Sequence, residues 1–547
     1  MTSPTAAKAT PALDTLRRAA ILVACAALLA LALVHHPVGG WNVNSRLALV
    51  AAVANNGDFK IDPWHNTRPY QTGDKAFFGG HYYSDKIFGV SLLAVPPAWV
   101  LARLGAELPF DWWHHAMRLW AVALPAALSV GLLFAILGRL GVPPRRALLA
   151  ALLPFFGSMW FGYSTVFYPY APGIACQLGA LWLILFPPAR RMTHRGSAAI
   201  GFLLGYSWLC DQIFGIGSAL LAGVYFLRLL DQGGIWGQRA FAEMAGLRSN
   251  PRQLVLLALA FWAAAFVSPG LYAAYTWSIF GEVVNPYAHH ADPLFRERMA
   301  QGLMGIGAPS LDVLWFITLH PARGLFFWSP VLLLAAVGCA LGVRQDGKRR
   351  LLGWLGLAYL AGYLLLNSGY YMWWGGWAMG PRFLIPAIPF LALGLGEVLR
   401  LAKPAKKGDD PPPAHRWGLP ALVATGVASL ALSLPLSLSD PQMPQGGRAE
   451  EFFAATVAHP PPTTLGAYAK SFWKMEFTPW LGDRLMRRVY APNAPKGRQA
   501  AGWLLWLLAA LAPAALAWRL LPRAPLFARI DYPMKTSDGS LGPPPPS

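Results

Sequence analysis

Most residues that could carry out chemistry lie in one polar stretch after the first apolar run. Four aspartates and five basic residues fall within about forty positions. They are Arg46, Asp58, Lys60, Asp62, Arg68, Asp74, Lys75, Asp85 and Lys86. A carboxylate can act as a general base toward a hydroxyl group, and a Lys or Arg side chain can bind a phosphate. A solvated loop would explain each single charge, so the density of the cluster is the informative feature.

The end of this stretch places charge beside aromatic rings. His81, Tyr82 and Tyr83 lead into Asp85-Lys86, and apolar Ile87 follows directly. Aromatic residues of this kind collect where a membrane meets water, at the level of the lipid head groups. The sequence therefore predicts a reactive or binding site at a membrane surface.

The composition is that of an integral membrane protein. Of the 547 residues, 55% are hydrophobic and only 13% are charged, whereas soluble domains carry roughly 25% charged residues. The net charge of +20 would suggest nucleic-acid binding in a soluble protein. Here the basic residues fall in short loops between apolar runs, which is the pattern of the positive-inside rule. We therefore expect membrane lipids as partners and no nucleic acid.

Apolar runs of roughly 20 residues predict an all-α polytopic membrane protein with about twelve transmembrane helices. The expected spans are 19–34, 116–138, 147–163, 170–187, 197–213, 214–230, 254–276, 323–343, 351–367, 381–399, 418–437 and 502–520. The run 87–104 is ambiguous because Pro96-Pro97 interrupts it. Only if it does not span do the short basic loops all fall in the cytoplasm. We therefore expect a helix at 87–104 that lies in, or dips into, the outer interface.

This topology divides the chain into segments. The N-terminus (1–18), the polar loop 401–417 and the tail 521–547 are expected in the cytoplasm, and the loop and tail are expected to be disordered because they are polar and Pro-rich. A membrane module covers 19–400, and a C-terminal pair of spans covers 418–520. The expected outer segments are 36–115, with a short helix at 42–55, then 277–322 and 438–501.

Other polar groups are expected at the same outer face. Asp211 lies at the tip of a tight helical hairpin, where an ionisable residue suggests function, although it could equally cap the next helix. Residues 370–382 combine Trp374 and Trp377 with Gly375-Gly376 and end in Gly-Pro-Arg382. An aromatic belt needs no such glycines. Arg382 at a helix start is a candidate anion ligand, and Arg323 is either a second one or an interface anchor.

Several of these motifs resemble the GT-C glycosyltransferases, multispan enzymes that use polyprenyl-phosphate sugars. Residues 82–86 (YYSDK) are similar to the Tyr-Phe-Glu-Lys-Pro-Pro stretch of the aminoarabinose transferase family, although Ile87 and Phe88 replace its prolines. Residues 323–330 (RGLFFWSP) and 373–391 (WWGGWAMGPRFLIPAIPFL) resemble a bacterial branch of the superfamily. The resemblance covers roughly residues 15–400 and says nothing of the sugar.

The resemblance implies a GT-C-like bundle in a bacterial inner membrane, with interfacial helices in the first outer loop and an active site facing outward. A hexosyl or pentosyl group would pass from a polyprenyl-phosphate donor to an unknown acceptor, with inversion. The expected phosphate ligands are Lys86, Arg382 and Arg323. The expected base is Asp74, followed by Asp62 and Asp58. Supporting roles fall to Asp85, Arg46, His81, Tyr82, Tyr83, Asp211, Trp374 and Trp377.

One departure leaves alternatives open. Many GT-C enzymes carry an acid where the first span leaves the membrane, and here Asn42 and Asn44 stand there. A non-catalytic GT-C-like protein, a flippase or transporter, and a ligase of lipid-linked sugars are therefore alternatives to a transferase. No cofactor is required by the sequence. A divalent cation stays open, although the one tight pair of acids, Asp409-Asp410, is expected in the cytoplasm.

Overall fold

The structure is a computed structural model of the chain. It describes residues 4–34, 40–106, 108–187, 192–230, 251–320, 323–376, 378–400, 413–439, 441–442 and 511–521. Trp377, nearly all of the expected outer segment 438–501, most of the loop 401–417 and the tail after 521 lie outside the described residues. Predictions for those parts of the chain therefore stay predictions.

In the described residues, the first half of the chain forms helices and one β-hairpin, joined by loops. Its elements are α1 (Pro4–Ala32), α2 (Trp41–Asn56), β1 (Lys75–Phe78), β2 (His81–Ser84), α3 (Gly89–Arg103), α4 (Phe110–Arg118), the π-helix η1 (Leu119–Ala123), α5 (Leu124–Arg139), α6 (Pro144–Phe156), α7 (Met159–Ser164), α8 (Tyr170–Leu185), α9 (His194–Cys210), the 3-10 helix η2 (Gln212–Phe214) and α10 (Gly215–Leu230). The expected helix at 42–55 is thus confirmed as α2, and Gly57 ends it in the left-handed conformation with a φ of 71°.

The second half of the chain continues the helical pattern. Its elements are α12 (Pro251–Ala265), α13 (Val267–Phe280), η3 (Pro286–His289), α14 (Pro293–Met299), α15 (Leu311–Thr318), α16 (Leu325–Trp328), α17 (Pro330–Val343), α18 (Gly347–Gly369), η4 (Arg382–Ala387), α19 (Ile388–Ala392), α20 (Leu395–Leu399) and α21 (Pro413–Ser439). Residues 511–520 are also helical.

The helices confirm an all-α polytopic membrane protein. Seven helical runs in the described residues are long and apolar enough to cross a membrane. They are Leu13–Ala32, Phe110–Arg139, Gln212–Leu230, Pro251–Phe280, Gly347–Gly369, Arg382–Leu399 and Trp417–Leu434. Three shorter apolar helices accompany them, Gly89–Arg103, Tyr170–Leu185 and Pro330–Val343. The helix expected at 87–104 is α3, and Pro96-Pro97 lies inside it.

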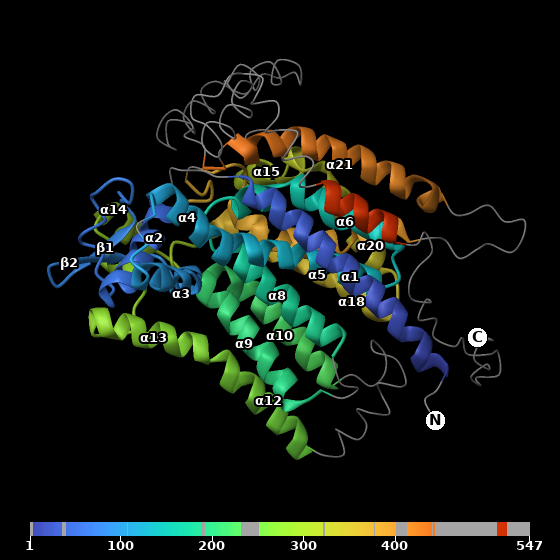
Figure 1. Cartoon of the computed structure of the whole chain (residues 1–547), viewed down its shortest axis with the longest axis horizontal. Helices are drawn as coiled ribbons and strands as arrows, with labels where there is room; N and C mark the ends of the chain where they lie inside the picture. Colours follow the sequence, from blue (N-terminus) through green and yellow to red (C-terminus); the bar gives the residue numbers. More distant parts are fainter. Residues whose placement is uncertain are drawn as a thin grey trace, which may run out of the picture.

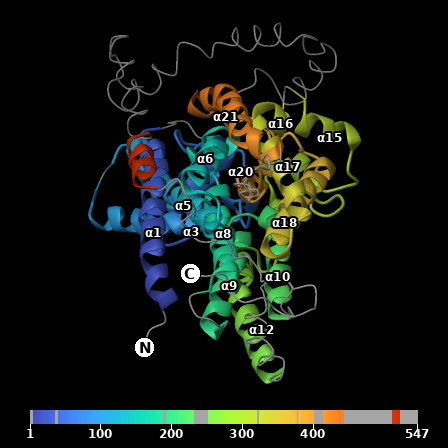
Figure 2. The same ribbon diagram turned by 90° about the vertical axis from the view of Figure 1, so that its right-hand side faces the viewer.

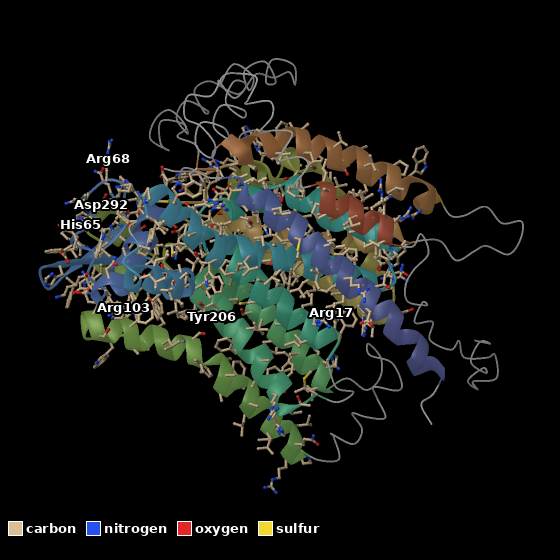
Figure 3. All side chains as sticks on the ribbon, in the orientation of Figure 1. Arg17, His65, Arg68, Arg103, Tyr206 and Asp292 are labelled. Atoms are coloured by element: carbon tan, nitrogen blue, oxygen red, sulfur yellow. The ribbon has the colours of Figure 1, made fainter. Side chains whose placement is uncertain are left out.

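The long helices pack side by side, and the short elements gather at one end. α1 lies along α5, α8 lies along α9, and α17 packs on α18 (Figures 1 and 2). α2, α3, α4, α14 and the β-hairpin cluster at the end of the molecule away from the N-terminus (Figure 1). Figure 3 places His65 and Asp292 at this end and Arg17 toward the opposite one. We call this the hairpin end.

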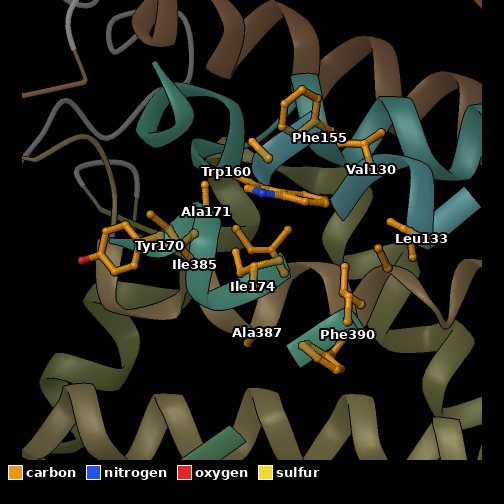
Figure 4. Packing of buried hydrophobic residues seen from close by; sticks show 14 of the residues in the cluster. Val130, Leu133, Phe155, Trp160, Tyr170, Ala171, Ile174, Ile385, Ala387 and Phe390 are labelled. Carbon is orange, nitrogen blue, oxygen red and sulfur yellow. The ribbon is translucent and has the colours of Figure 1, made fainter. Parts of the chain in front are cut away.

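The core is apolar and continuous through the bundle. Trp160, Phe155, Ile174, Ile385 and Phe390 are buried in it and pack together between neighbouring helices (Figure 4). Burying a large apolar side chain of this kind contributes about 1.5–3 kcal/mol in water. Within a bilayer, close packing takes over much of that role because lipid tails are themselves apolar.

Some expected spans are interrupted rather than continuous. The run 147–163 breaks at Gly157 between α6 and α7, and the run 323–343 breaks at Ser329 before Pro330. The run 381–399 begins as the 3-10 helix η4, with Pro386 inside it. Proline removes a backbone donor and clashes with the preceding turn, so it ends or distorts a helix. Apolar composition alone does not register such breaks.

Candidate active site

The β-hairpin explains the polar and aromatic stretch at residues 79–86. Strands β1 and β2 pair antiparallel, with Phe78 opposite His81, and Gly79-Gly80 forms the two-residue turn. Both glycines have positive φ, 57° and 82°, which is the backbone that a two-residue hairpin turn of this kind needs. Sequence reasoning missed this hairpin, although a Gly-Gly pair between two short aromatic runs is a recognised signal for one.

The hairpin delivers Asp85 and Lys86 to the protein interior. The exposure of β2 falls along its length, and Ser84, Asp85 and Lys86 are all buried. The outer end of the hairpin, at Gly79 and Gly80, is exposed. A polar sequence therefore turns inward, and its charged pair lies beneath the surface rather than on it.

The Lys86 ammonium group contacts three oxygen atoms. Its Nζ lies 2.8 Å from Asp85 Oδ2 and 2.9 Å from Asp74 Oδ2. It also donates a hydrogen bond to the Tyr287 hydroxyl. A lysine ammonium has three hydrogen-bond donors and no acceptor. All three donors of Lys86 are therefore engaged, two of them by carboxylates.

A histidine completes this cluster from a distant part of the chain. His290 Nε2 lies 3.5 Å from Asp85 Oδ2, and the ring is buried and stacked on Tyr287. The backbone N–H of Asp292 donates to His290 Nδ1 at 3.0 Å. The Asp292 carbonyl also lies 3.2 Å from Nδ1, so the backbone there can donate to Nδ1 or accept from it, depending on the tautomer of the ring. The sequence predicted residues 286–292 only as part of the outer segment 277–322. Tyr287, His289, His290 and Asp292 form a dense polar run there, and this run is the signal that could have indicated a site.

Burial and charge oppose each other in the cluster. Burial raises the pKa of Asp85, while Lys86 acts to lower it. Burial alone would lower the pKa of Lys86, but Asp74 and Asp85 outweigh it, and the pKa is raised. Lys86 is therefore a firmly protonated cation. Burial also raises the pKa of Tyr287, and the two carboxylates raise it further, so its hydroxyl stays neutral.

Helix α2 forms one wall of the cluster. Ser45 Oγ lies 2.7 Å from Ser84 Oγ and 3.5 Å from Asp85 Oδ1. Arg46 donates to the Ile87 carbonyl and lies 3.8 Å from Asp211 Oδ2. Asp211 Oδ1 also accepts from the Ile213 N–H at 3.2 Å. Asp211 is therefore both a helix cap and a partner of Arg46.

Asn42 and Asn44, which replace the acid expected after the first span, support their neighbours. Asn42 Oδ1 accepts from Arg46 Nε at 3.1 Å. Asn44 Nδ2 donates to the Gln71 carbonyl at 2.8 Å. The same loop is held at Thr72, whose Oγ1 donates to the Trp41 carbonyl at 2.8 Å and accepts from the Asp74 N–H at 3.0 Å. The two asparagines thus help to position Arg46 and the loop that carries Asp74.

Arg382 is a second cation, and its surroundings differ. Its guanidinium lies over the rings of Tyr168 and Phe383, 5.3 Å and 4.9 Å from their centroids. Its Nε is buried without a hydrogen-bond partner, and in the described residues its guanidinium has no carboxylate within ion-pair distance. Gly375, with a φ of 72°, lets the side chain pass, because a Cβ there would lie 2.8 Å from Arg382 Nε.

Arg323 is buried and bonded to backbone. Its Nη1 donates to the carbonyls of Ala378 and, at 3.3 Å, Gly380, and its Nη2 donates to the Gly376 carbonyl at 3.3 Å. These contacts hold the loop that leads into Arg382.

Lys86 and Arg382 act electrostatically on the same tyrosine, Tyr370. Burial raises the pKa of Tyr370, and the charges of Lys86 and Arg382 both act to lower it. The pKa of Tyr287 likewise responds to Asp85, Asp74 and Arg382. We call this region the polar interior. It comprises Asp74, Asp85, Lys86, Tyr287, His290, Tyr370 and Arg382.

The remaining predicted residues lie outside the polar interior. Asp58 Oδ1 accepts from the Lys60 N–H at 3.2 Å. Asp62 accepts from the Tyr82 N–H at 3.2 Å and lies 3.4 Å from His81 Nδ1. The other placements are as follows: Tyr82 packs on His65, Tyr83 on Phe280, and Trp374 on Trp373.

No family model and no curated protein matches this chain. Solved structures with a similar course of the chain include the apo oligosaccharyltransferase of Archaeoglobus fulgidus, with a TM-score of 0.43, 13% identity and 86% of this chain covered. The same archaeal enzyme, AglB, with an inhibitory peptide and a dolichol-phosphate gives 0.42, 13% and 86%. ArnT from Cupriavidus metallidurans in the apo state gives 0.42, 15% and 91%.

This chain matches 60% of the length of the archaeal enzyme and 75% of that of ArnT.

Proposed function

We propose that this protein is a membrane glycosyltransferase that moves a sugar from a polyprenyl-phosphate donor to an acceptor hydroxyl at the outer face of a bacterial inner membrane. One observation carries the proposal. The polar interior holds a carboxylate fixed by a buried cation, Asp74 on Lys86, together with a second cation, Arg382, that has no carboxylate partner in the described residues. A base and an anion ligand are the two groups that such a transfer needs.

Asp74 is the proposed base. Of the three candidate acids, it is the one in contact with Lys86. Its side chain is 17% exposed. Asp58 accepts from the backbone of its own loop at Lys60 instead, and Asp62 accepts from the backbone of β2 at Tyr82. Asp74 would accept the proton of the acceptor hydroxyl as its oxygen attacks the sugar carbon. The bond from that carbon to the phosphate oxygen breaks, and polyprenyl phosphate leaves on the opposite side, with inversion.

Arg382 is the proposed ligand of the donor phosphate. A guanidinium can bind two phosphate oxygens at once, and Tyr168 and Phe383 already orient it. Arg323 would act as a positioning residue through the carbonyls of Gly376, Ala378 and Gly380. Lys86 would contribute charge to the site, because its three donors are already engaged.

Asp85 is the proposed positioning partner of Lys86. It is fully buried, so an acceptor hydroxyl cannot reach it directly. Asn42 and Asn44 are compatible with catalysis in this scheme, because Asp74 supplies the carboxylate that the usual position lacks.

The test is donor turnover by the purified protein in lipid nanodiscs. A panel of radiolabelled polyprenyl-phosphate hexoses and pentoses would be supplied with membrane lipid and glycan acceptors, and release of polyprenyl phosphate would be measured. We expect Asp74→Asn to lose about 100-fold or more in turnover, the scale of a general base, with donor binding retained. Asp312→Asn, which changes an exposed aspartate at the start of α15, is the matched control.

The alternatives predict different results. Wild-type turnover by Asp74→Asn would remove Asp74 as the base. Donor binding with no release by the wild type would indicate a non-catalytic GT-C-like protein. Movement of intact donor across a vesicle membrane would indicate a flippase.

A further inference from the structure

Three residues of the polar interior form a ligand set for a divalent cation. One donor atom each from Asp74, Asp85 and His290 lies within 4.8 Å of the other two. Two carboxylate oxygens and one imidazole nitrogen suit ions such as Mn²⁺ or Zn²⁺. His290 Nε2 is buried and has no hydrogen-bond partner, so an aromatic nitrogen faces the carboxylates without one.

The Lys86 ammonium already stands among these ligands. Its Nζ lies 2.9 Å from Asp74 Oδ2 and 2.8 Å from Asp85 Oδ2. Asp85 Oδ2 is also the atom that lies 3.5 Å from His290 Nε2. Its third donor reaches Tyr287. A divalent ion bound to these oxygens would need to sit about 2.0–2.6 Å from each. An ion on these same oxygens would lie close to the ammonium group, and the two like charges would repel each other.

We propose that Lys86 is a built-in cation occupying a divalent-ion site, so that the wild-type protein needs no metal at Asp74, Asp85 and His290, and that removing the ammonium opens this site to a metal ion. The inference does not depend on the proposed reaction, because it concerns only which cation neutralises the two carboxylates. Removing one partner of a buried ion pair leaves an uncompensated charge, and a metal ion would compensate for it.

His290 is suited to either state. With its proton on Nε2, the ring accepts at Nδ1 from the Asp292 N–H at 3.0 Å. A metal ion would need a bare Nε2, and Nδ1 would then carry the proton. The Asp292 carbonyl lies 3.2 Å from Nδ1 and can accept it. A histidine ligand commonly donates its other ring N–H to a carbonyl in this way.

The experiment measures Mn²⁺ binding by electron paramagnetic resonance, with the full chain in nanodiscs after chelator treatment. We expect the wild type to bind no Mn²⁺ at this cluster. We expect Lys86→Ala to bind one ion per chain, and Lys86→Ala/His290→Gln to bind it about 10- to 100-fold more weakly, the usual cost of disturbing such a site. Lys86→Ala/Asp312→Asn is the control for loss of an unrelated carboxylate.

Three results would overturn the proposal. One is Mn²⁺ binding by the wild type that Asp85→Asn abolishes, since a metal would then share the site with Lys86. Another is a folded Lys86→Ala protein that binds no Mn²⁺. The third is a Lys86→Ala protein that stays unfolded in excess Mn²⁺, judged by size-exclusion chromatography and thermal unfolding, because the ion should restore the missing charge. A variant that folds only with Mn²⁺ would support the proposal.

Discussion

The two cations of the polar interior are held in opposite ways. Lys86 has every donor engaged, two of them by carboxylates. Arg382 lies against aromatic rings, and its Nε has no hydrogen-bond partner. A cation paired in this manner fixes its partners, whereas a cation without an anion keeps the capacity to bind one. In the proposed function, this difference separates a positioning centre at Lys86 from a binding centre at Arg382.

Arg323 sharpens the contrast. The Nη1 and Nη2 groups of Arg323 donate to carbonyls of the loop that precedes Arg382. Two arginines that look equivalent in the sequence therefore have different roles. The availability of donors, rather than charge, distinguishes a ligand-binding arginine from a structural one.

The largest effect is expected from removing the positioning cation. Lys86→Met leaves Asp74 and Asp85 uncompensated in a buried place, and loss of one partner of a buried ion pair costs about 3–5 kcal/mol. We expect the free energy of unfolding to fall by that amount, measured by chemical denaturation in detergent with chelator present. Asp85→Asn/Lys86→Met should recover part of the loss. Equal stability of Lys86→Met and wild type would contradict the ion-pair account.

The next effect concerns the binding cation. Arg382→Ala should weaken donor binding about 10- to 100-fold, because charge-assisted hydrogen bonds contribute about 1.5–3 kcal/mol. Arg382→Lys should recover the charge but not the two-point contact. Binding of a polyprenyl-phosphate sugar would be followed by tryptophan fluorescence. Stability should change little, and a large loss of stability with unchanged affinity would reverse the roles assigned to the two cations.

A smaller effect is expected at Arg323. Arg323→Lys loses the planar fork that reaches three carbonyls, and lost hydrogen bonds of this kind cost about 1–2 kcal/mol. We expect lower stability together with a several-fold weaker donor affinity, because Arg382 follows the affected loop. Arg103→Lys, at an exposed arginine over Trp99, should change neither quantity. Unchanged donor affinity in Arg323→Lys would limit Arg323 to stability alone.

The smallest effect is a pH dependence of stability that arises from His65, at the hairpin end. Burial lowers the pKa of His65 below its ordinary 6.5, and Lys75 lowers it further. Lys75 Nζ donates to His65 Nδ1 at 2.8 Å, which requires a neutral ring. This contact should therefore stabilise the fold above pH 6.5 and lose its effect as the pH falls through the lowered pKa. The melting temperature of wild type should exceed that of His65→Gln only at the higher pH, and a pH-independent difference would rule this out.

Local patterns in the sequence predicted much of the fold. Helix α2 and its end at Gly57, several of the apolar spans, and a helix at 87–104 within the first outer segment were readable from composition and spacing. The hairpin at Lys75–Ser84 was missed, because the Gly-Gly signal was treated as part of a loop. The Asp85-Lys86 pair was singled out correctly as polar and unusual, yet nothing in the local pattern indicated that it is buried.

The sequence by itself determined which segments are apolar helices, since burial in a membrane depends on the composition and length of each run. It also determined where the ionisable groups concentrate. Only the tertiary structure decided which of these groups meet. Asp74, Lys86, Tyr287 and His290 come from segments up to about two hundred residues apart, and their contacts arise from packing, which no local pattern encodes. Whether a charged group is paired or available is therefore a property of the fold.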